Sequence, residues 1–206
     1  MPPNAVQNGS SALIDTGFTN ITGGATYSAG YIFAALSTGN GTNGVASYLY
    51  RLNPILNVND NTNCPSSNVC PQITGVSNLD ETIFNFGTTY SAFYPVQQPD
   101  LEGNVFTVFS YSHASIYPSV AYVAQRVTQG PSLTDYGYFL AYGSAPYTAG
   151  YWGNYNAVAP AGVGYAGGSS GKVASPGILF SGMYAATGTA WGTAIGYGLY
   201  TSPIQP

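Results

Sequence analysis

Charged residues are nearly absent from this sequence of 206 residues. Lys and Arg number 3, Asp and Glu number 7, and charged residues make up 5% of the chain, against about 25% in an average globular domain. Three cations and a net charge of −4 argue against nucleic acid as a partner, because many Lys and Arg side chains are needed to neutralise a phosphate backbone. Few carboxylates also leave few groups whose protonation could unfold the chain in acid. The composition therefore predicts an extracellular or cell-surface protein, from an acidic medium or from ordinary secretion.

Long apolar runs and helical periodicity are lacking as well. The longest clean apolar run, 31–36, covers about six residues, far short of the ~20 that a membrane span needs, so no membrane span is expected. Short β-branched and aromatic runs instead recur between clusters of Gly, Pro, Asn and Ser, which predicts an all-β fold. The run 105–109 is apolar on both of its alternating faces, which predicts a strand buried between stacked sheets. The candidate strands are 12–19, 26–36, 46–52, 72–76, 82–86, 92–97, 105–112, 119–127, 136–142, 156–159, 177–184 and 191–200.

Two cysteines and three sequons are consistent with export. Cys64 and Cys70 lie in a segment rich in Pro, Ser and Asn, and no further Cys or His stands nearby to complete a metal site. A disulfide that staples this loop is therefore expected, with two free thiols as the alternative. Asn8, Asn20 and Asn40 each begin an Asn-x-Ser/Thr triplet in a Gly-rich turn and are the candidate glycosylation sites. Because the N-terminus has no signal-peptide pattern, an exported chain would be mature, trimmed or the tail of a longer reading frame.

Apolar segments recur at a regular spacing along the chain. Segments beginning at 31, 105 and 178 are 74 and then 73 residues apart, and the strands that follow them, at 47, 119 and 192, are 72 and 73 apart. Two series with the same spacing predict a repeat of about 73 residues, within a single all-β unit that spans 1–206. The units are assigned to 11–87, 88–150 and 151–206. Three to four strands in each unit is the size of a large propeller blade with long loops.

The middle unit carries a resemblance to a known group of proteins. The residues concerned are Tyr94-Pro95, Asp100-x-x-Gly103-Asn104, Tyr111-Ser112, Tyr117-Pro118-Ser119 and Arg126, followed by Trp152-Gly153-Asn154-Tyr155. This pattern resembles blades of secreted β-propeller repeat proteins, with sialidase-like Asp-box turns, and their uncharacterised extracellular relatives. The resemblance covers about 88–200. At Asn154 an Asp is common in such blades, so the departure weakens any ion-binding or catalytic role tied to that position.

The resemblance implies β-propeller-type blades, about three in number. Closed propellers have four to eight blades, and an open array would leave sheet edges unprotected. The expectation is therefore part of a larger ring, completed by another chain or by copies of this one. The alternative is a β-sandwich.

Catalytic chemistry finds little support in the sequence. His113 is the single imidazole, no Gly-x-Ser-x-Gly elbow is present, and His113 is expected to be a turn residue. Arg51 and Arg126 fall near the ends of equivalent strands and are expected to form structural bridges with Asp100 or Asp135. The adjacent carboxylates of Asp80 and Glu81 are expected in a loop. No catalytic residue and no metal ligand is assigned.

Two segments remain as candidate binding sites. The segment 57–63 is dense in oxygen ligands, but it has one carboxylate and lacks the terminal Glu of a helix–loop–helix calcium site, so a solvated turn is favoured over Ca²⁺ and no cofactor is expected. Tyr147, Tyr151, Trp152 and Tyr155 lie within a stretch crowded with aromatic residues. Tyr and Trp offer an apolar face and a polar edge to sugars and to proteins, whereas packing between blades would use the same residues.

The sequence thus favours an extracellular binding or structural module over an enzyme, with a polysaccharide or a protein as its ligand. One alternative is a fragment of a secreted, glycosidase-like propeller enzyme. Another is a surface or filament subunit that assembles from copies of itself, for which low charge and abundant Tyr are suited. The three alternatives stay open at the level of the sequence, because propellers host many activities.

Overall fold

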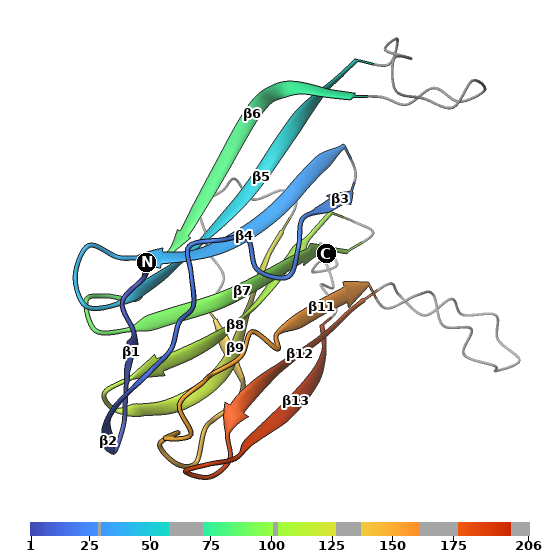
Figure 1. Cartoon of the computed structure of the whole chain (residues 1–206). Coiled ribbons are helices and arrows are strands. Elements are labelled where there is room, and N and C mark those ends of the chain that lie inside the picture. Colours follow the sequence, from blue (N-terminus) through green and yellow to red (C-terminus); the bar gives the residue numbers. More distant parts are fainter. Residues whose placement is uncertain (29, 58–71, 101–102, 127–136, 161–176, 199–206) are drawn as a thin grey trace, which may run out of the picture.

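The computed structural model describes residues 1–28, 30–57, 72–100, 103–126, 137–160 and 177–198, and these residues form an all-β fold (Figure 1). The all-β prediction is confirmed. No helix among the described residues is long and apolar enough to span a membrane. The strands are β1 (Ala5–Gln7), β2 (Ser10–Ile14), β3 (Thr26–Ser28), β4 (Tyr31–Gly39), β5 (Val45–Asn57), β6 (Gln72–Phe84), β7 (Ser91–Pro99), β8 (Val105–His113), β9 (Ile116–Gln125), β10 (Tyr138–Ala141), β11 (Ala157–Pro160), β12 (Ile178–Ala185) and β13 (Trp191–Gly198).

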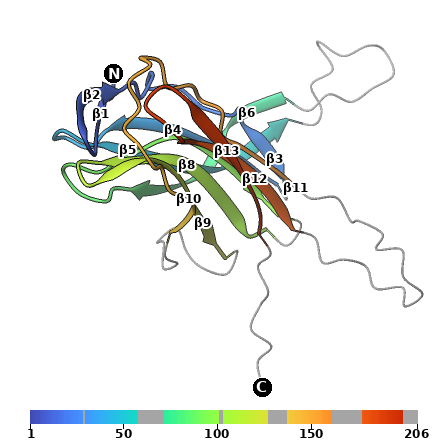
Figure 2. The same cartoon turned by 90° about the horizontal axis from the view of Figure 1, so that it is seen from below.

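The strands form three stacked layers, each of them an antiparallel meander. The first layer contains β3–β6, the middle layer β7–β10 and the third layer β11–β13 (Figure 1). A single parallel bridge between Val45 of β5 and Ser91 of β7 joins the first and middle layers into one eight-stranded sheet that folds back on itself. The third layer is a separate sheet that lies across β8 and β9 (Figure 2). The hairpin of β1 and β2 is held at one end of the stack, where Ser112 Oγ donates to the carbonyl of Val6.

The middle layer is buried on both faces. Phe109 of β8 packs with Leu49 and Phe84 of the first layer. Phe106, on the opposite face of β8, packs with Phe180 of the third layer. The predicted burial of 105–109 between stacked sheets is therefore confirmed.

Uncharged side chains link the layers at an irregularity in β7. The register of β7 shifts at Tyr94, whose φ of 53° lies in the left-handed region that a Tyr rarely adopts. The amide of Tyr94 donates to Ser37 Oγ in the first layer at 2.9 Å, and its carbonyl accepts from Asn156 Nδ2, just before β11, at 2.8 Å. The carbonyl of Pro95 accepts from Thr22 Oγ1. At this bulge, backbone groups of β7 form hydrogen bonds with side chains of the other layers and so link all three layers. No charged side chain takes part in these hydrogen bonds.

Two expectations about the strands need correction. The expected strands 72–76 and 82–86 are joined into one continuous strand, β6, which ends at Phe84, so that Asp80 and Glu81 lie in a strand and not in a loop. The expected strand 26–36 is divided into β3 and β4. No sheet closes on itself among the described residues, which fits stacked sheets.

The three predicted units each contain one meander. The first spacing series falls on β4, β8 and β12, and the second on β5, β9 and β13. The repeat itself stays a prediction, and so does the propeller arrangement.

Candidate functional site: the outer face of the third layer

The strand β13 has an inverted pattern of side-chain size. Its large side chains face solvent: Trp191 is 45%, Ile195 74% and Tyr197 54% exposed. The alternate positions, which face the middle layer, are Gly192, Ala194, Gly196 and Gly198. A strand that covers a core normally has apolar residues inside and polar residues outside, so the exposed set requires an explanation of its own.

The glycines on the inner face are required by the rings that fill the space beside them. A Cβ at Gly196 would lie 2.5 Å from Phe180 Cε2, and a Cβ at Gly198 would lie 2.7 Å from Phe106 Cε1. Real Cβ atoms do not approach this closely, so the neighbouring rings dictate glycine here. The inner face of β13 is therefore set by packing against the middle layer, whereas its outer face is free of that constraint.

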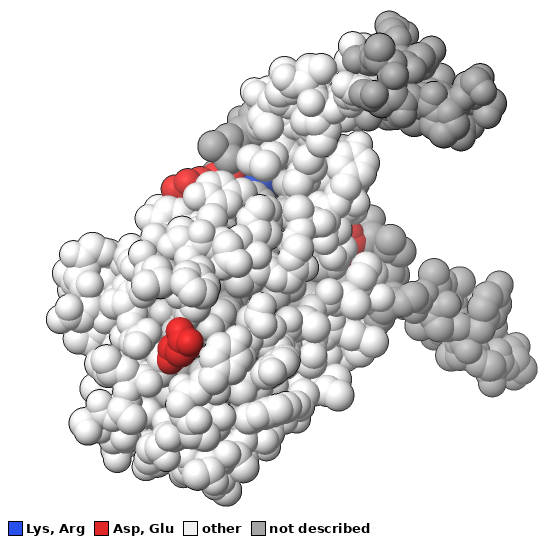
Figure 3. All heavy atoms as spheres, in the orientation of Figure 1, with Lys and Arg blue, Asp and Glu red and all other residues white. Residues whose placement is uncertain are grey.

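The outer face of the sheet also has an apolar hollow. Its volume is about 190 Å³. The hollow forms where small residues of β11 lie beside longer ones of β12 and β13, and β11–β13 contain no charged residue. In Figure 3 the charged atoms are confined to a few spots, and none appears over β12 and β13. The lining residues are Ala157, Ala159, Leu179, Phe180, Ser181 and Ile195.

An aromatic pair lies at one end of this face. The rings of Tyr155 and Trp191 stack with centroids 5.5 Å apart and an interplanar angle of 19°, and Tyr155 is 56% exposed. The ring of Tyr155 lies flat over Gly153, where an added Cβ would be 2.2 Å from Tyr155 Cε2. Tyr151 is also exposed. Together the pair provides a flat apolar surface with polar edges.

The four aromatic residues that the sequence suggested for binding differ in their exposure to solvent. Tyr151 and Tyr155 are exposed, whereas Trp152 is fully buried and Tyr147 is 6% exposed. The rings of Tyr147 and Trp152 meet edge to face at 5.1 Å in the core, and Trp152 Nε1 donates to Ser110 Oγ. The suggestion is corrected for these two residues, because a ring buried between layers presents no face to a ligand.

Trp191 takes part in the exposed pair, although the sequence did not suggest it. The only signal in the sequence was that Trp191 begins a segment in which large and small side chains alternate. Such alternation does not indicate which face of the strand is buried. Its partner Tyr155 is 36 positions earlier in the chain, and the pairing depends on how β11–β13 assemble.

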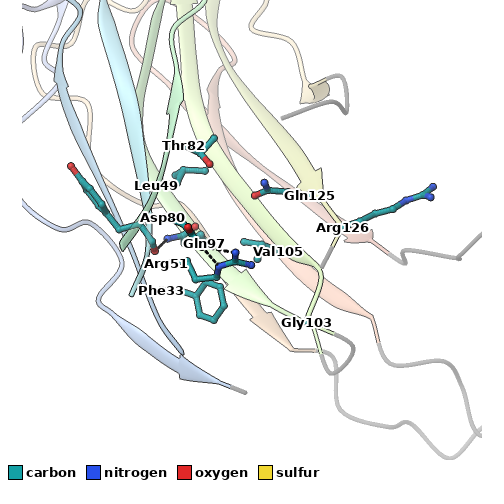
Figure 4. Close-up of a pocket in the computed structure, with 11 residues that line it drawn as sticks. Phe33, Leu49, Arg51, Asp80, Thr82, Gln97, Gly103, Val105, Gln125 and Arg126 are labelled. Atoms are coloured by element: carbon teal, nitrogen blue, oxygen red, sulfur yellow. Dashed lines mark hydrogen bonds and ion pairs between the residues drawn. The ribbon is translucent and has the colours of Figure 1, made fainter. Parts of the chain in front are cut away.

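A second candidate site is the hollow between the first and middle layers. Its lining contains a structural ion pair between Arg51 and Asp80. Arg51 Nε donates to Asp80 Oδ2 at 2.8 Å (Figure 4). The guanidinium also lies 5.3 Å from the ring centre of Tyr31. Arg126 also lines this hollow, but its side chain points away from Arg51 in Figure 4. The space left is about 20 Å³, room for about one water molecule.

The partner of Arg51 differs from the expectation. Asp80 stands opposite Arg51 in the β5–β6 register, whereas the Asp100 carboxylate accepts from the amide and Nδ2 of Asn104, both at 2.9 Å, within its own turn. The expected bridge from Arg51 to Asp100 is therefore wrong. Asp135 lies outside the described residues.

His113 is held by hydroxyl groups. The amide of Ser115 donates to Nδ1 at 3.2 Å, so the ring proton is assigned to Nε2, which lies 3.1 Å from Thr89 Oγ1. The ring stacks on Tyr90 at 3.9 Å. Within the described part of the chain, no carboxylate bonds to this imidazole and no group of three His, Cys, Asp or Glu residues is placed to hold a metal. The expectation of a turn residue is wrong: His113 is the last residue of β8, paired with Ile116 of β9 directly before the turn.

The expected modification sites have different surroundings. Asn20 is exposed and Asn8 is half-buried. Asn40 Nδ2, the atom that a glycan would bond, donates to the carbonyl of Gly87 at 2.8 Å. Cys64 and Cys70 lie outside the described residues, as does 58–63 of the oxygen-rich segment. Glycosylation, the disulfide and Ca²⁺ binding stay predictions.

No protein family, curated protein or solved structure matches this chain.

Proposed function

We propose that the protein is an extracellular structural module that assembles with further copies of itself through the outer face of the third layer. The observation that carries this proposal is the inverted pattern of β13, in which Ile195 and Tyr197 face solvent while Gly196 and Gly198 face the core. An apolar patch without a role in folding is characteristic of an interaction surface. The nearly uncharged composition supports the extracellular setting.

The centre of this face favours a protein partner over a sugar. Leu179 of β12 and Ile195 of β13 lie diagonally across the two strands, opposite Tyr197 and Ser181, and are 47% and 74% exposed. Aliphatic side chains at the centre of a patch are typical of contacts between protein subunits, and such contacts are depleted in charge. A sugar would need polar groups there, and Ser181 is the nearest polar residue of the hollow.

The ring arrangement belongs to the same proposal. Three meanders stacked face to face are fewer than a closed propeller contains. A larger ring would therefore take its remaining blades from another chain or from copies of this one. Association through the outermost sheets would also protect the apolar surface that an isolated stack exposes.

Saccharide binding is a second candidate function, favoured by the stacked pair of Tyr155 and Trp191. The pair has an apolar surface and two polar edges, the Tyr hydroxyl and the indole N–H, which suit a sugar ring. Retention on an immobilised polysaccharide, lost in Trp191→Ala, would support this candidate. Unchanged retention in Trp191→Ala would place any sugar site elsewhere.

Light scattering of the native protein over a wide concentration range tests the first proposal. We expect the mass to rise above the 21.4 kDa of one chain, and we expect Ile195→Asp to abolish the rise because it places a charge in the apolar patch. Ala114→Asp, in the exposed turn between β8 and β9, adds the same charge elsewhere and should leave association unchanged. A monomer at every concentration would overturn the proposal.

A further inference from the structure

An exposed turn between β2 and β3 contains one of the three sequons. Residues 18–21 are all exposed, with Phe18 at 66% and Ile21 at 50%. The amide of Asn20 donates to the carbonyl of Phe18 at 2.9 Å, so the chain turns tightly between these two residues. Thr22 is buried and completes the triplet Asn20-Ile21-Thr22. Residues 18–22 are here called the sequon turn.

The fold holds the sequon turn in place at both of its ends. Before the turn, an added Cβ at Gly17 would lie 2.7 Å from Tyr94 Cε1, so the backbone there is packed against that ring. At the other end, the amide of Thr22 donates to the carbonyl of Ala35 at 3.0 Å, and Thr22 Oγ1 donates to the carbonyl of Pro95. The exposed residues of the turn thus project from an anchored backbone.

The sequon turn has an aromatic ring two positions before the Asn of its triplet. At the corresponding positions before the other two sequons the residues are Val6 and Thr38, which have no ring. The face of an aromatic ring is apolar and suits the C–H groups of a sugar. Because the chain turns between Phe18 and Asn20, a sugar bonded to Asn20 Nδ2 would lie within reach of the Phe18 ring.

The side chain of Asn40, by contrast, belongs to the internal structure of its loop. Asn40 Nδ2 donates to the carbonyl of Gly87 at 2.8 Å and to Asn85 Oδ1 at 3.4 Å, so both of its N–H groups have protein acceptors. A Cβ at Gly44 would lie 2.4 Å from the same nitrogen. Asn40 Oδ1 accepts from Thr42 Oγ1 at 2.7 Å. A sugar on this nitrogen would break these contacts, so the folded loop opposes modification of Asn40.

We propose that Asn20 carries an N-linked saccharide and that the ring of Phe18 packs against its first sugar. The donor is a saccharide on a polyprenyl diphosphate, transferred during export. A bond forms between Asn20 Nδ2 and C1 of the first sugar, the C1–O bond breaks with its electron pair leaving on the diphosphate, and Nδ2 loses one proton to solvent. The inference uses the extracellular setting of the proposed function and does not depend on self-assembly.

The saccharide must be added before the chain has folded. The triplet is recognised through its hydroxyl residue as well as its Asn, and in the folded chain Thr22 is 4% exposed with its hydroxyl bonded to the carbonyl of Pro95. Folding then buries Thr22 and leaves Asn20 in solvent. A saccharide added to Asn20 in the unfolded chain is therefore compatible with the folded turn.

Peptide mass mapping of the secreted protein measures the occupancy of each sequon. The chain is secreted from a eukaryotic cell line behind a cleavable signal peptide, and the mapping is repeated on protein from its natural source. We expect a saccharide on Asn20 and none on Asn40. Asn20→Gln removes the acceptor, whereas Thr19→Gln, at the exposed neighbouring position, is the matched control that retains it. An unmodified Asn20 in the folded, secreted protein would overturn the proposal.

A double-mutant cycle tests the contact between the saccharide and Phe18. The glycosylated fraction of each protein is purified, and Asn20→Gln is made in the wild type, in Phe18→Leu and in Phe18→Tyr. In the wild type, loss of the saccharide should lower the midpoint of thermal unfolding by about 2–4 °C, as expected for one aromatic contact in a chain of this size. The same loss should have little effect in Phe18→Leu. Phe18→Tyr keeps the ring and should restore the effect.

The outcomes separate this inference from the proposed function. An equal fall of the unfolding midpoint in the wild type and in Phe18→Leu would overturn the role of Phe18. The substitution Asn20→Gln leaves β11–β13 intact, so association measured by light scattering should be unchanged. An occupied Asn20 on a protein that stays monomeric would contradict self-assembly alone, whereas an unmodified Asn20 on a protein that associates would contradict this inference alone.

Discussion

The strands β8 and β13 differ in what covers their two faces. In β8, Phe106 and Phe109 point to opposite faces and are 3% and 1% exposed, because another layer covers each face. In β13 the large side chains all point one way, into solvent, and Ile195 is 74% exposed. Full burial of such a side chain is worth about 1.5–3 kcal/mol. The middle layer therefore holds the fold together, whereas the outer residues of β13 contribute little to folding.

Truncation of one large residue in each strand should give the largest difference. Phe109→Ala should cost ~3–5 kcal/mol, because it leaves a cavity between Phe84 and the rest of the core. Ile195→Ala should change stability by less than about 0.5 kcal/mol, as for other exposed positions. Urea unfolding of both variants measures the two values. Equal losses would contradict the difference in burial between the two strands.

The two faces of β13 itself should respond differently to the same side chain. Gly196→Val should cost ~1–3 kcal/mol, because its Cβ would press on Phe180 and on Leu140. Thr193→Val, on the outer face of the same strand, is the matched control and should be nearly neutral. Thermal unfolding of the two variants makes the comparison. A neutral Gly196→Val would mean that the inner face is not tightly packed.

The links between layers give the next effect. Asn156 Nδ2 donates to the Tyr94 carbonyl and, at 3.2 Å, to Ser110 Oγ, so it joins the segment before β11 to both β7 and β8. Asn156→Ala should cost about 1–2 kcal/mol, because buried acceptors lose their donor. Asn154→Ala, exposed on the same segment, is the control. Chemical denaturation measures the stability of both variants. Equal unfolding midpoints would contradict a stabilising role for the Asn156 hydrogen bonds.

Much of the fold was accessible from the sequence because alternation and length report directly on strands. The expected ranges 105–112 and 177–184 match β8 and β12 to within a residue or two. One exception is β6, where the polar residues around Asp80 suggested a break. That strand pairs with β5 alone, and an edge strand accommodates polar side chains.

The site was less accessible, because it depends on contacts between distant residues. Trp152 is buried by the middle layer, with Ser110 as its hydrogen-bond partner 42 positions earlier. The partner of Arg51 is decided by the β5–β6 register. The alternation of 191–200 predicted a strand, but either set of alternate residues could have faced the core. The small size of Gly196 and Gly198 becomes decisive once Phe106 and Phe180 are known to lie against them.

The smallest effect at neutral pH is expected from a tyrosine of the middle layer, Tyr111. Burial raises the pKa of Tyr111 to about 12, with a smaller contribution from Tyr90, whereas an unfolded tyrosine ionises near pH ~10. The folded state favours the neutral phenol, so this stabilisation is complete below pH ~10 and is lost as the pH rises through about 12. Tyr111→Phe removes that loss, although burial also raises the pKa of Tyr94 and of Tyr122. We therefore expect a small upward shift of the alkaline unfolding midpoint and, at pH 7, a change in stability below ~1 kcal/mol.

Alkaline unfolding followed by circular dichroism measures this shift. Tyr197→Phe, on the outer face of the third layer and 54% exposed, is the matched control in the other layer. A larger shift for Tyr111→Phe than for Tyr197→Phe would place the alkaline sensitivity in the middle layer, where both faces are buried. Equal shifts would contradict that assignment, because exposure and burial would then have the same effect on the ionisation that unfolds the protein.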